Sequence, residues 1–116
     1  KLGSLYVSES AHAFLTTTVY NSEPSEDSPF TAIVEAFRFA FALGYSNGLK
    51  IKSKGTTKTV APRQFTVTEY LDILESDIDG DYSSLGGLAS AYAEAGVKLM
   101  IDCADSGKSI LSTLDN

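Results

Sequence analysis

The sequence is poor in the residues that carry most protein chemistry. Its 116 residues include one cysteine, Cys103, and one histidine, His12. A single cysteine cannot form a disulfide within the chain, and a single histidine cannot by itself supply a metal cluster. These shortages exclude a disulfide scaffold and a structural zinc site. We therefore expect neither a metal nor another cofactor.

Long hydrophobic runs are missing as well. No apolar stretch approaches the roughly 18 to 20 residues that span a bilayer, and the first residues show neither the apolar region nor the cleavage pattern of a secretory signal. We therefore expect a cytoplasmic protein that makes no membrane contact.

The overall composition is that of one globular domain. Hydrophobic residues make up 43% of the chain and charged residues 21%, which excludes collagen-like, low-complexity and wholly disordered chains. Two separate hydrophobic cores are improbable at this length. We expect one helical domain over residues 1–107, followed by a C-terminal tail over residues 108–116.

The charges are unevenly distributed along the chain, whose net charge is −6. Five of the nine basic residues lie between Ser46 and Thr68, a stretch that holds no acid. The next stretch, Glu69–Asp81, contains acids and no base. The two blocks could attract one another between molecules. The basic residues of the first block are Lys50, Lys52, Lys54, Lys58 and Arg63.

Hydrophobic periodicity predicts a mainly α fold, a compact bundle of about four helices. The second and clearest helix would start at Ser28-Pro29 and end at Gly44 or at Asn47-Gly48. The segment Ser8–Tyr20 is compatible with a helix capped by Ser8 or with a strand, and we favour the helix. Two more apolar stripes, the first with acids on its outer face and the second beside small residues, predict two further helices. They run from Thr66 or Thr68 to Asp79 and from Ser84 to Asp102.

Two features between and within these helices leave alternatives open. Residues 49–60 predict a short β-hairpin or an extended basic loop between the second and third helices. In the last helix, Gly87, Ala91 and Ala95 recur every fourth residue and form a smooth strip. This strip would pack against the helix that starts at Ser28-Pro29, or it would form the seam of a homodimer.

Three motifs with known chemistry fail on inspection. Asp77, Asp79 and Asp81 have the spacing of calcium ligands, but Tyr82 stands where the loop needs glycine and Leu88 where it needs glutamate. The sequence Gly107-Lys108-Ser109 lacks the earlier glycine and the strand of a phosphate-binding loop. Cys103 continues an apolar stripe, and His12 lies between two alanines, which favours structural roles for both. We therefore expect no catalytic residues and no enzyme.

The basic segment carries the most functional information. Lys50, Lys52 and Lys54 would share one face of an extended strand, with Lys58 and Arg63 on the return, so that several cations could touch adjacent phosphates of DNA. The competing interpretation is that these lysines keep an exposed strand soluble or dock a protein partner.

Two longer segments carry a resemblance to a known family. They are Ala36–Tyr45, which ends in Leu-Gly-Tyr and is followed by a basic turn, and Leu88–Val97, which holds a Tyr-Ala pair close to glycine. In order and spacing the chain resembles the small proteins associated with bacterial Dnd systems, which modify DNA by phosphorothioation or restrict DNA that lacks this mark. The resemblance implies a non-enzymatic accessory or adaptor protein that acts through protein partners. The alternative is a small DNA-binding regulator that uses the basic loop over residues 50–63.

Overall fold

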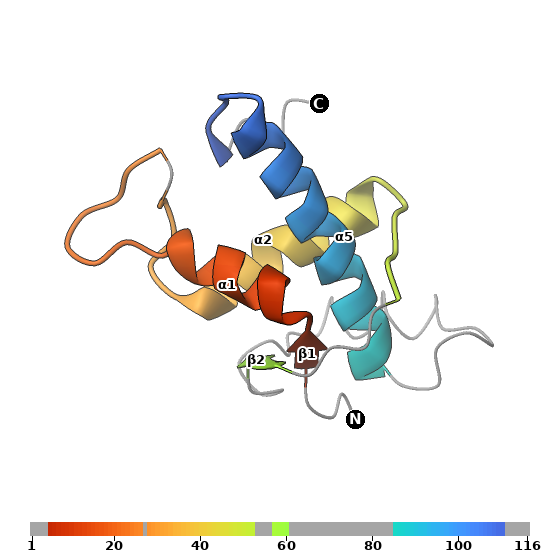
Figure 1. Cartoon of the computed structure of the whole chain (residues 1–116). Helices are drawn as coiled ribbons and strands as arrows, with labels where there is room; N and C mark the ends of the chain where they lie inside the picture. Colours follow the sequence, from red (N-terminus) through yellow and green to blue (C-terminus); the bar gives the residue numbers. More distant parts are fainter. Residues whose placement is uncertain (1–4, 27, 53–56, 61–84, 111–116) are drawn as a thin grey trace.

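Three helices and a short strand pair make up the part of the chain that the computed structural model describes, which is residues 5–26, 28–52, 57–60 and 85–110. Helices α2 and α5 cross one another, α1 lies beside them, and the strand pair lies near the amino-terminal ends of α1 and α5 (Figure 1). The elements in chain order are β1 (Leu5–Val7), α1 (Glu9–Thr17), α2 (Ile33–Ser46), β2 (Thr57–Val60) and α5 (Leu85–Asp105).

Helix α1 confirms the helical interpretation of the first ambiguous segment. The Ser8 hydroxyl caps it by accepting a hydrogen bond from the Ala11 amide at 3.2 Å. Ala11 and Leu15 form its buried face. The helix ends at Thr17, within a run of β-branched residues. Val19, the last of that run, forms a bridge with Phe30.

Helix α2 begins later than its start signal predicts. The capping residue is Ala32, not Ser28, and the first helical residue is Ile33. The reason lies in the bridge: the Phe30 amide donates to the Thr18 carbonyl at 3.1 Å, and the Phe30 carbonyl accepts from Tyr20 at 3.0 Å. These bonds hold Phe30 in an extended segment whose side chain is buried. The Ser28-Pro29 pair therefore lies in the connection and not in the helix.

The end of α2 matches one of the two predicted stops. Asn47 is the C-terminal capping residue, and Gly48 follows with a φ of 65°. The Gly48 amide donates to Tyr45 and the Leu49 amide to Gly44, the pair of bonds that defines a Schellman motif. The left-handed conformation at Gly48 turns the chain back toward α5.

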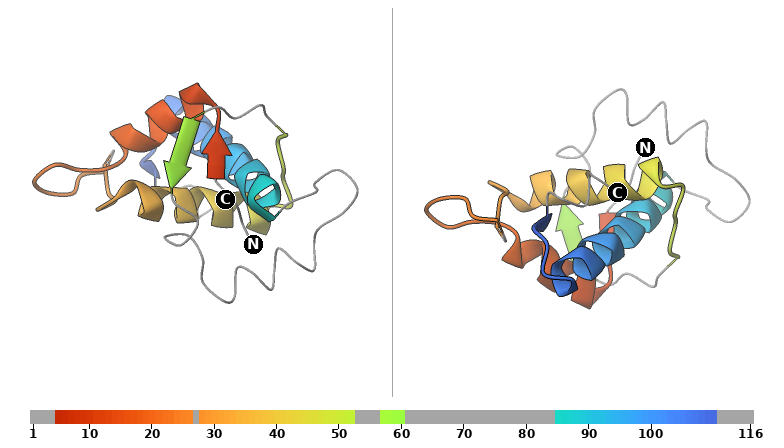
Figure 2. Two further views of the ribbon diagram at one scale, coloured as in Figure 1. Left: turned by 90° about the horizontal axis from the view of Figure 1, so that it is seen from below. Right: turned by 90° about the horizontal axis from the view of Figure 1, so that it is seen from above.

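The crossing of α2 and α5 brings two backbones into direct contact. A methyl group added at Gly96 would collide with the carbonyl oxygen of Ala40, and one added at Gly44 would collide with the carbonyl oxygen of Tyr92. Ala40 and Gly44 lie one turn apart on α2, and they contact Gly96 and Tyr92 in the reverse order on α5. The two helices therefore run in opposite directions at the crossing (Figure 2). Only glycine permits this approach.

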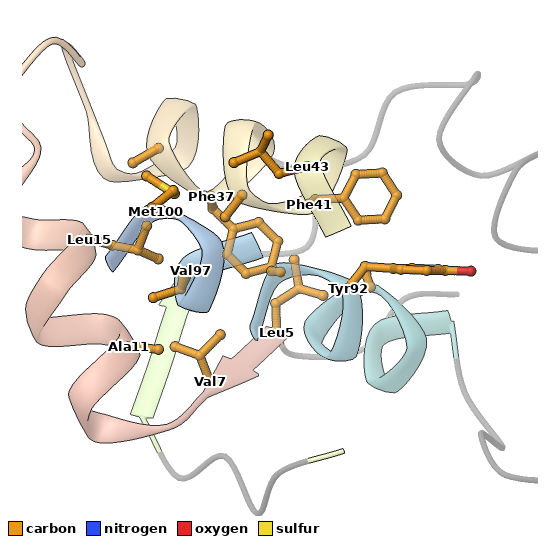
Figure 3. Packing of buried hydrophobic residues seen from close by; sticks show 14 of the residues in the cluster. Leu5, Val7, Ala11, Leu15, Phe37, Phe41, Leu43, Tyr92, Val97 and Met100 are labelled. Carbon is orange, nitrogen blue, oxygen red and sulfur yellow. The ribbon is translucent and has the colours of Figure 1, made fainter. Parts of the chain in front are cut away.

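Around the crossing, side chains from β1 and the three helices form one core (Figure 3). Phe37 and Phe41 from α2 meet Leu88 and Met100 from α5, all at most 1% exposed. The strand β1 adds its alternate residues Leu5 and Val7, while Tyr6 between them is exposed. Beyond α5, Ile110 is also buried in this core.

The predicted hairpin is not the pairing that the structure forms. The strand β2 pairs antiparallel with β1, with Val60 opposite Leu5 and Thr57 opposite Val7. Residues 49–52 form no strand, so the extended-loop alternative describes them better. The physical reason is that β1, held in the core by Leu5 and Val7, needs a partner for its backbone amides and carbonyls. A strand of three residues is too short to show a sequence signal. The helix expected from Thr66 or Thr68 to Asp79 lies outside the described residues.

The last helix confirms its predicted stripe and continues three residues beyond Asp102. Its end is again a Schellman motif, with Gly107 at a φ of 82° and amide bonds from Gly107 to Ala104 and from Lys108 to Cys103. Within the described residues, no helix has the length and apolar character needed to cross a membrane.

The glycine contact makes a stability prediction. Replacing Gly96 by alanine should lower the free energy of unfolding by about 1 to 3 kcal/mol, because the Ala40 backbone must move to admit the new methyl group. Lys108→Ala, at an exposed position just beyond the same helix, is the control and should change stability by less than about 0.5 kcal/mol. Urea unfolding followed by circular dichroism measures both. Equal stability of Gly96→Ala and the parent would contradict the close approach.

Candidate functional site

The three predicted basic residues that the structure describes do not lie on one wing. Lys50 and Lys52 are exposed on the loop that follows α2. Lys58 lies in β2, opposite Tyr6, and the backbone of β2 is separated from that loop by β1 and by α5 (Figures 1 and 2). Lys54 and Arg63 lie outside the described residues. Of the three predicted residues that the structure describes, Lys50 and Lys52 thus lie together.

Lys50 belongs to an aromatic cluster at the end of α2. Its Nζ atom lies 5.8 Å from the ring centroid of Tyr92, a cation–π distance. The Tyr92 ring meets Phe41 and Tyr45 edge-on, with centroid distances of 5.7 and 5.4 Å. This arrangement gives the Lys50 side chain a structural contact in addition to its exposed charge.

The loop 49–52 is fixed along α5. The Ile51 amide donates a hydrogen bond of 3.1 Å to the carbonyl of Ala91, and Ala91 and Ala95 are buried. The smooth strip predicted on the last helix is therefore covered in part by this loop of the same chain. Helix α2 packs instead against Gly96, the residue next to Ala95. Ala91 and Ala95 are thus buried within the chain, whereas Gly87 of the same strip is exposed.

Two surface hollows flank the loop and share three residues: Ile51, Lys98 and Asp102. The larger, of about 430 Å³, reaches from these residues to the start of α1, and the smaller, of about 250 Å³, reaches to Leu49 and Leu99. Val97 and Ile101 add apolar walls to the larger hollow. We call the combined surface the α5 groove, defined by the three shared residues together with Leu49, Leu99 and Ile101.

One wall of the α5 groove is anchored by a charged cap. Glu94 of α5 accepts two hydrogen bonds from Ser8, one from the hydroxyl at 2.6 Å and one from the amide at 3.0 Å. A carboxylate at the amino-terminal end of α1 also interacts favourably with the helix dipole. The cap ties α1 to α5 and gives the groove a fixed shape.

The chemically reactive residues lie apart from any recognisable catalytic arrangement in the described part of the chain. Cys103 is buried, as expected, and its thiol donates to the Ser109 carbonyl at 3.4 Å. His12 is half-buried on α1. Among the residues that the structure describes, no three histidines, cysteines or acids come together to hold a metal.

Comparisons with protein-family models, with curated proteins and with solved structures give no match for this chain. The resemblance to Dnd-associated proteins thus remains a prediction that depends on two segments. The structure places these segments on α2 and α5, and their glycines, Gly44 and Gly96, form the helix crossing. The glycines on which the resemblance depends therefore have packing roles in this structure.

Sequence reasoning missed the α5 groove. Lys98 and Asp102 look like ordinary polar residues on the outer face of the last helix, and Ile51 looks like the inward residue of an alternating strand. The only available signal was the excess of apolar residues beside the lysines, at Leu49 and Ile51, which are 45% and 36% exposed.

From the positions of Lys50 and Lys52, we expect that any affinity of the chain for DNA depends little on these two residues. With both replaced by glutamine, the affinity for a labelled DNA duplex and its dependence on salt should stay close to those of the parent, because Lys50 packs on Tyr92 and Lys58 lies elsewhere. The measurement is a fluorescence-anisotropy titration at several salt concentrations. Lys108→Gln with Lys98→Gln is the control of equal charge change.

A result against this expectation is easy to recognise. If both lysines contact phosphates, the slope of log affinity against log salt falls by about two units, since each phosphate contact contributes roughly 0.9. Such a fall in the loop variant, without a fall in the control, would show that the loop binds DNA.

Proposed function

We propose that the chain is a non-enzymatic accessory or adaptor protein of a bacterial DNA-modification or defence system and that it acts through protein–protein contacts in the cytoplasm. The observation that carries this proposal is the α5 groove. It combines the exposed apolar side chains Leu49 and Ile51 with the exposed charges of Lys98 and Asp102. Apolar centres with charged rims are typical of surfaces that bind proteins.

The rigidity of the groove supports the same conclusion. The Ile51–Ala91 hydrogen bond and the Lys50–Tyr92 contact hold the loop, and the Ser8–Glu94 cap holds the opposite wall. A surface that is ordered before binding loses little conformational entropy when a partner docks. The defence-system context depends on the resemblance of the segments Ala36–Tyr45 and Leu88–Val97.

A second candidate is a small DNA-binding regulator that uses Lys50, Lys52, Lys54, Lys58 and Arg63. The exposure of Lys50 and Lys52, two residues apart in an extended segment, favours it because this spacing places both cations on one side of the backbone. The salt dependence described above separates this candidate from the adaptor.

The adaptor proposal predicts the effect of one substitution in the groove. The products of the genes adjacent to the gene for this chain should be co-expressed with it, and at least one should co-purify. Ile51→Asp should weaken that complex at least about tenfold, because it places a charge in the apolar centre of the surface. Calorimetry with the purified partner gives the affinity.

The control is Ser22→Asp, which adds the same charge on the exposed connection between α1 and α2, away from the groove. Circular dichroism must show that both variants keep the parent melting temperature within a few degrees. The proposal fails if no adjacent gene product binds, or if Ile51→Asp binds its partner as tightly as the control does.

A further inference from the structure

Lys98 and Asp102 form an exposed pair of opposite charges on the outer face of α5. They are one helical turn apart, about 6 Å along the axis, and both are exposed. They make no ion pair with each other, and within the described part of the chain no hydrogen bond engages either side chain. Lysine placed before an acid at this spacing is the less favourable order within a helix. Both charged groups therefore face solvent at the α5 groove.

This pattern is complementary to itself. When two copies of α5 pack antiparallel around a two-fold axis, Lys98 lies opposite Asp102 of the partner subunit, and Asp102 lies opposite Lys98 of the partner subunit. The symmetry makes both pairs form at once, because a two-fold interface uses the same surface on each subunit. In a parallel arrangement each charge would face its own like, which is unfavourable. The pattern thus fixes the orientation and the register.

The borders of the charge pair are apolar. Leu49 and Ile51 are exposed on one side of α5, and Leu99 and Ile101 on the helix itself are half-buried. The hollows of about 430 and 250 Å³ beside the charges leave room for side chains of an approaching helix. Burial of these apolar groups would provide affinity, which exposed ion pairs alone seldom do.

We propose that the α5 groove binds a second copy of this chain, with the two α5 helices antiparallel and two reciprocal Lys98–Asp102 ion pairs between the subunits. This inference rests on the proposed function because it concerns the same surface, which a second copy and a product of an adjacent gene could not occupy at the same time. It differs from the seam predicted from the glycine and alanine strip, because Ala91 and Ala95 are buried within the chain.

A charge-swap experiment tests the proposal. Sedimentation equilibrium of the purified full chain at low ionic strength should show a monomer–dimer equilibrium. Lys98→Glu and Asp102→Lys should each raise the dissociation constant at least about tenfold, because each places like charges opposite one another twice. Mixing these two variants should restore dimers, since the mixed pair regains two unlike contacts, and the double variant Lys98→Glu/Asp102→Lys should dimerise like the parent.

The controls keep the net charge change but move it away from the groove. Lys108→Glu and Asp105→Lys carry the same changes on neighbouring exposed positions and should leave dimerisation within about threefold of the parent, in keeping with weak interactions between exposed charges. Circular dichroism melting confirms that each variant is folded.

Two results would overturn the inference. One is a parent chain that stays monomeric into the millimolar range at low salt, and the other is a failure of the mixed or double variants to restore association. If the chain is monomeric while Ile51→Asp still disrupts the complex with an adjacent gene product, the adaptor proposal survives and only the second copy is excluded. If no gene product binds but the charge swap behaves as expected, the groove is a dimer interface alone.

Discussion

The contact on which the rest of the structure depends is the backbone approach of α2 and α5 at Gly44 and Gly96. Glycine in a helix interior costs about 1 kcal/mol relative to alanine. Here that cost is offset because the two helices pack without intervening side chains at the crossing, and the large side chains on either side interlock. Phe37 and Phe41 then fill the space toward β1 and α5. Without the crossing these phenylalanines would have no common core.

The crossing also determines which face of α5 reaches the surface. One face of α5 packs on α2, and β1 and α1 lie against α5. The Schellman motif at Gly48 turns the chain back so that the loop 49–52 covers Ala91. What remains of α5 is the face with Lys98 and Asp102, bordered by the exposed side chains of that loop. The exposed face that carries the α5 groove is thus a consequence of how the core is closed.

The sequence predicts the parts of this fold whose cause is local. Serine before an apolar stripe favours a helix at α1, and asparagine followed by glycine is one of two predicted ends of α2, because caps act within a few residues. Two failures have a tertiary cause. Phe30 leaves the helical pattern because it pairs with Thr18 and Tyr20, and β2 joins β1, which lies about fifty residues away along the chain. No local rule contains these partners.

The candidate site was only half predictable, for a related reason. Charge composition singles out Lys50 and Lys52 without showing that an aromatic ring lies under Lys50. The residues beside them became informative only when the loop was placed along α5.

A basic loop alone attracts phosphate, whereas lysines interleaved with exposed leucine and isoleucine, next to an acid that belongs to the same surface, form a mixed pattern. Asp102 would repel a phosphate backbone at that point. The apolar side chains beside it would gain no favourable contact from phosphates. The same pattern is well matched to a protein surface, which can bury the apolar groups and neutralise both signs of charge together.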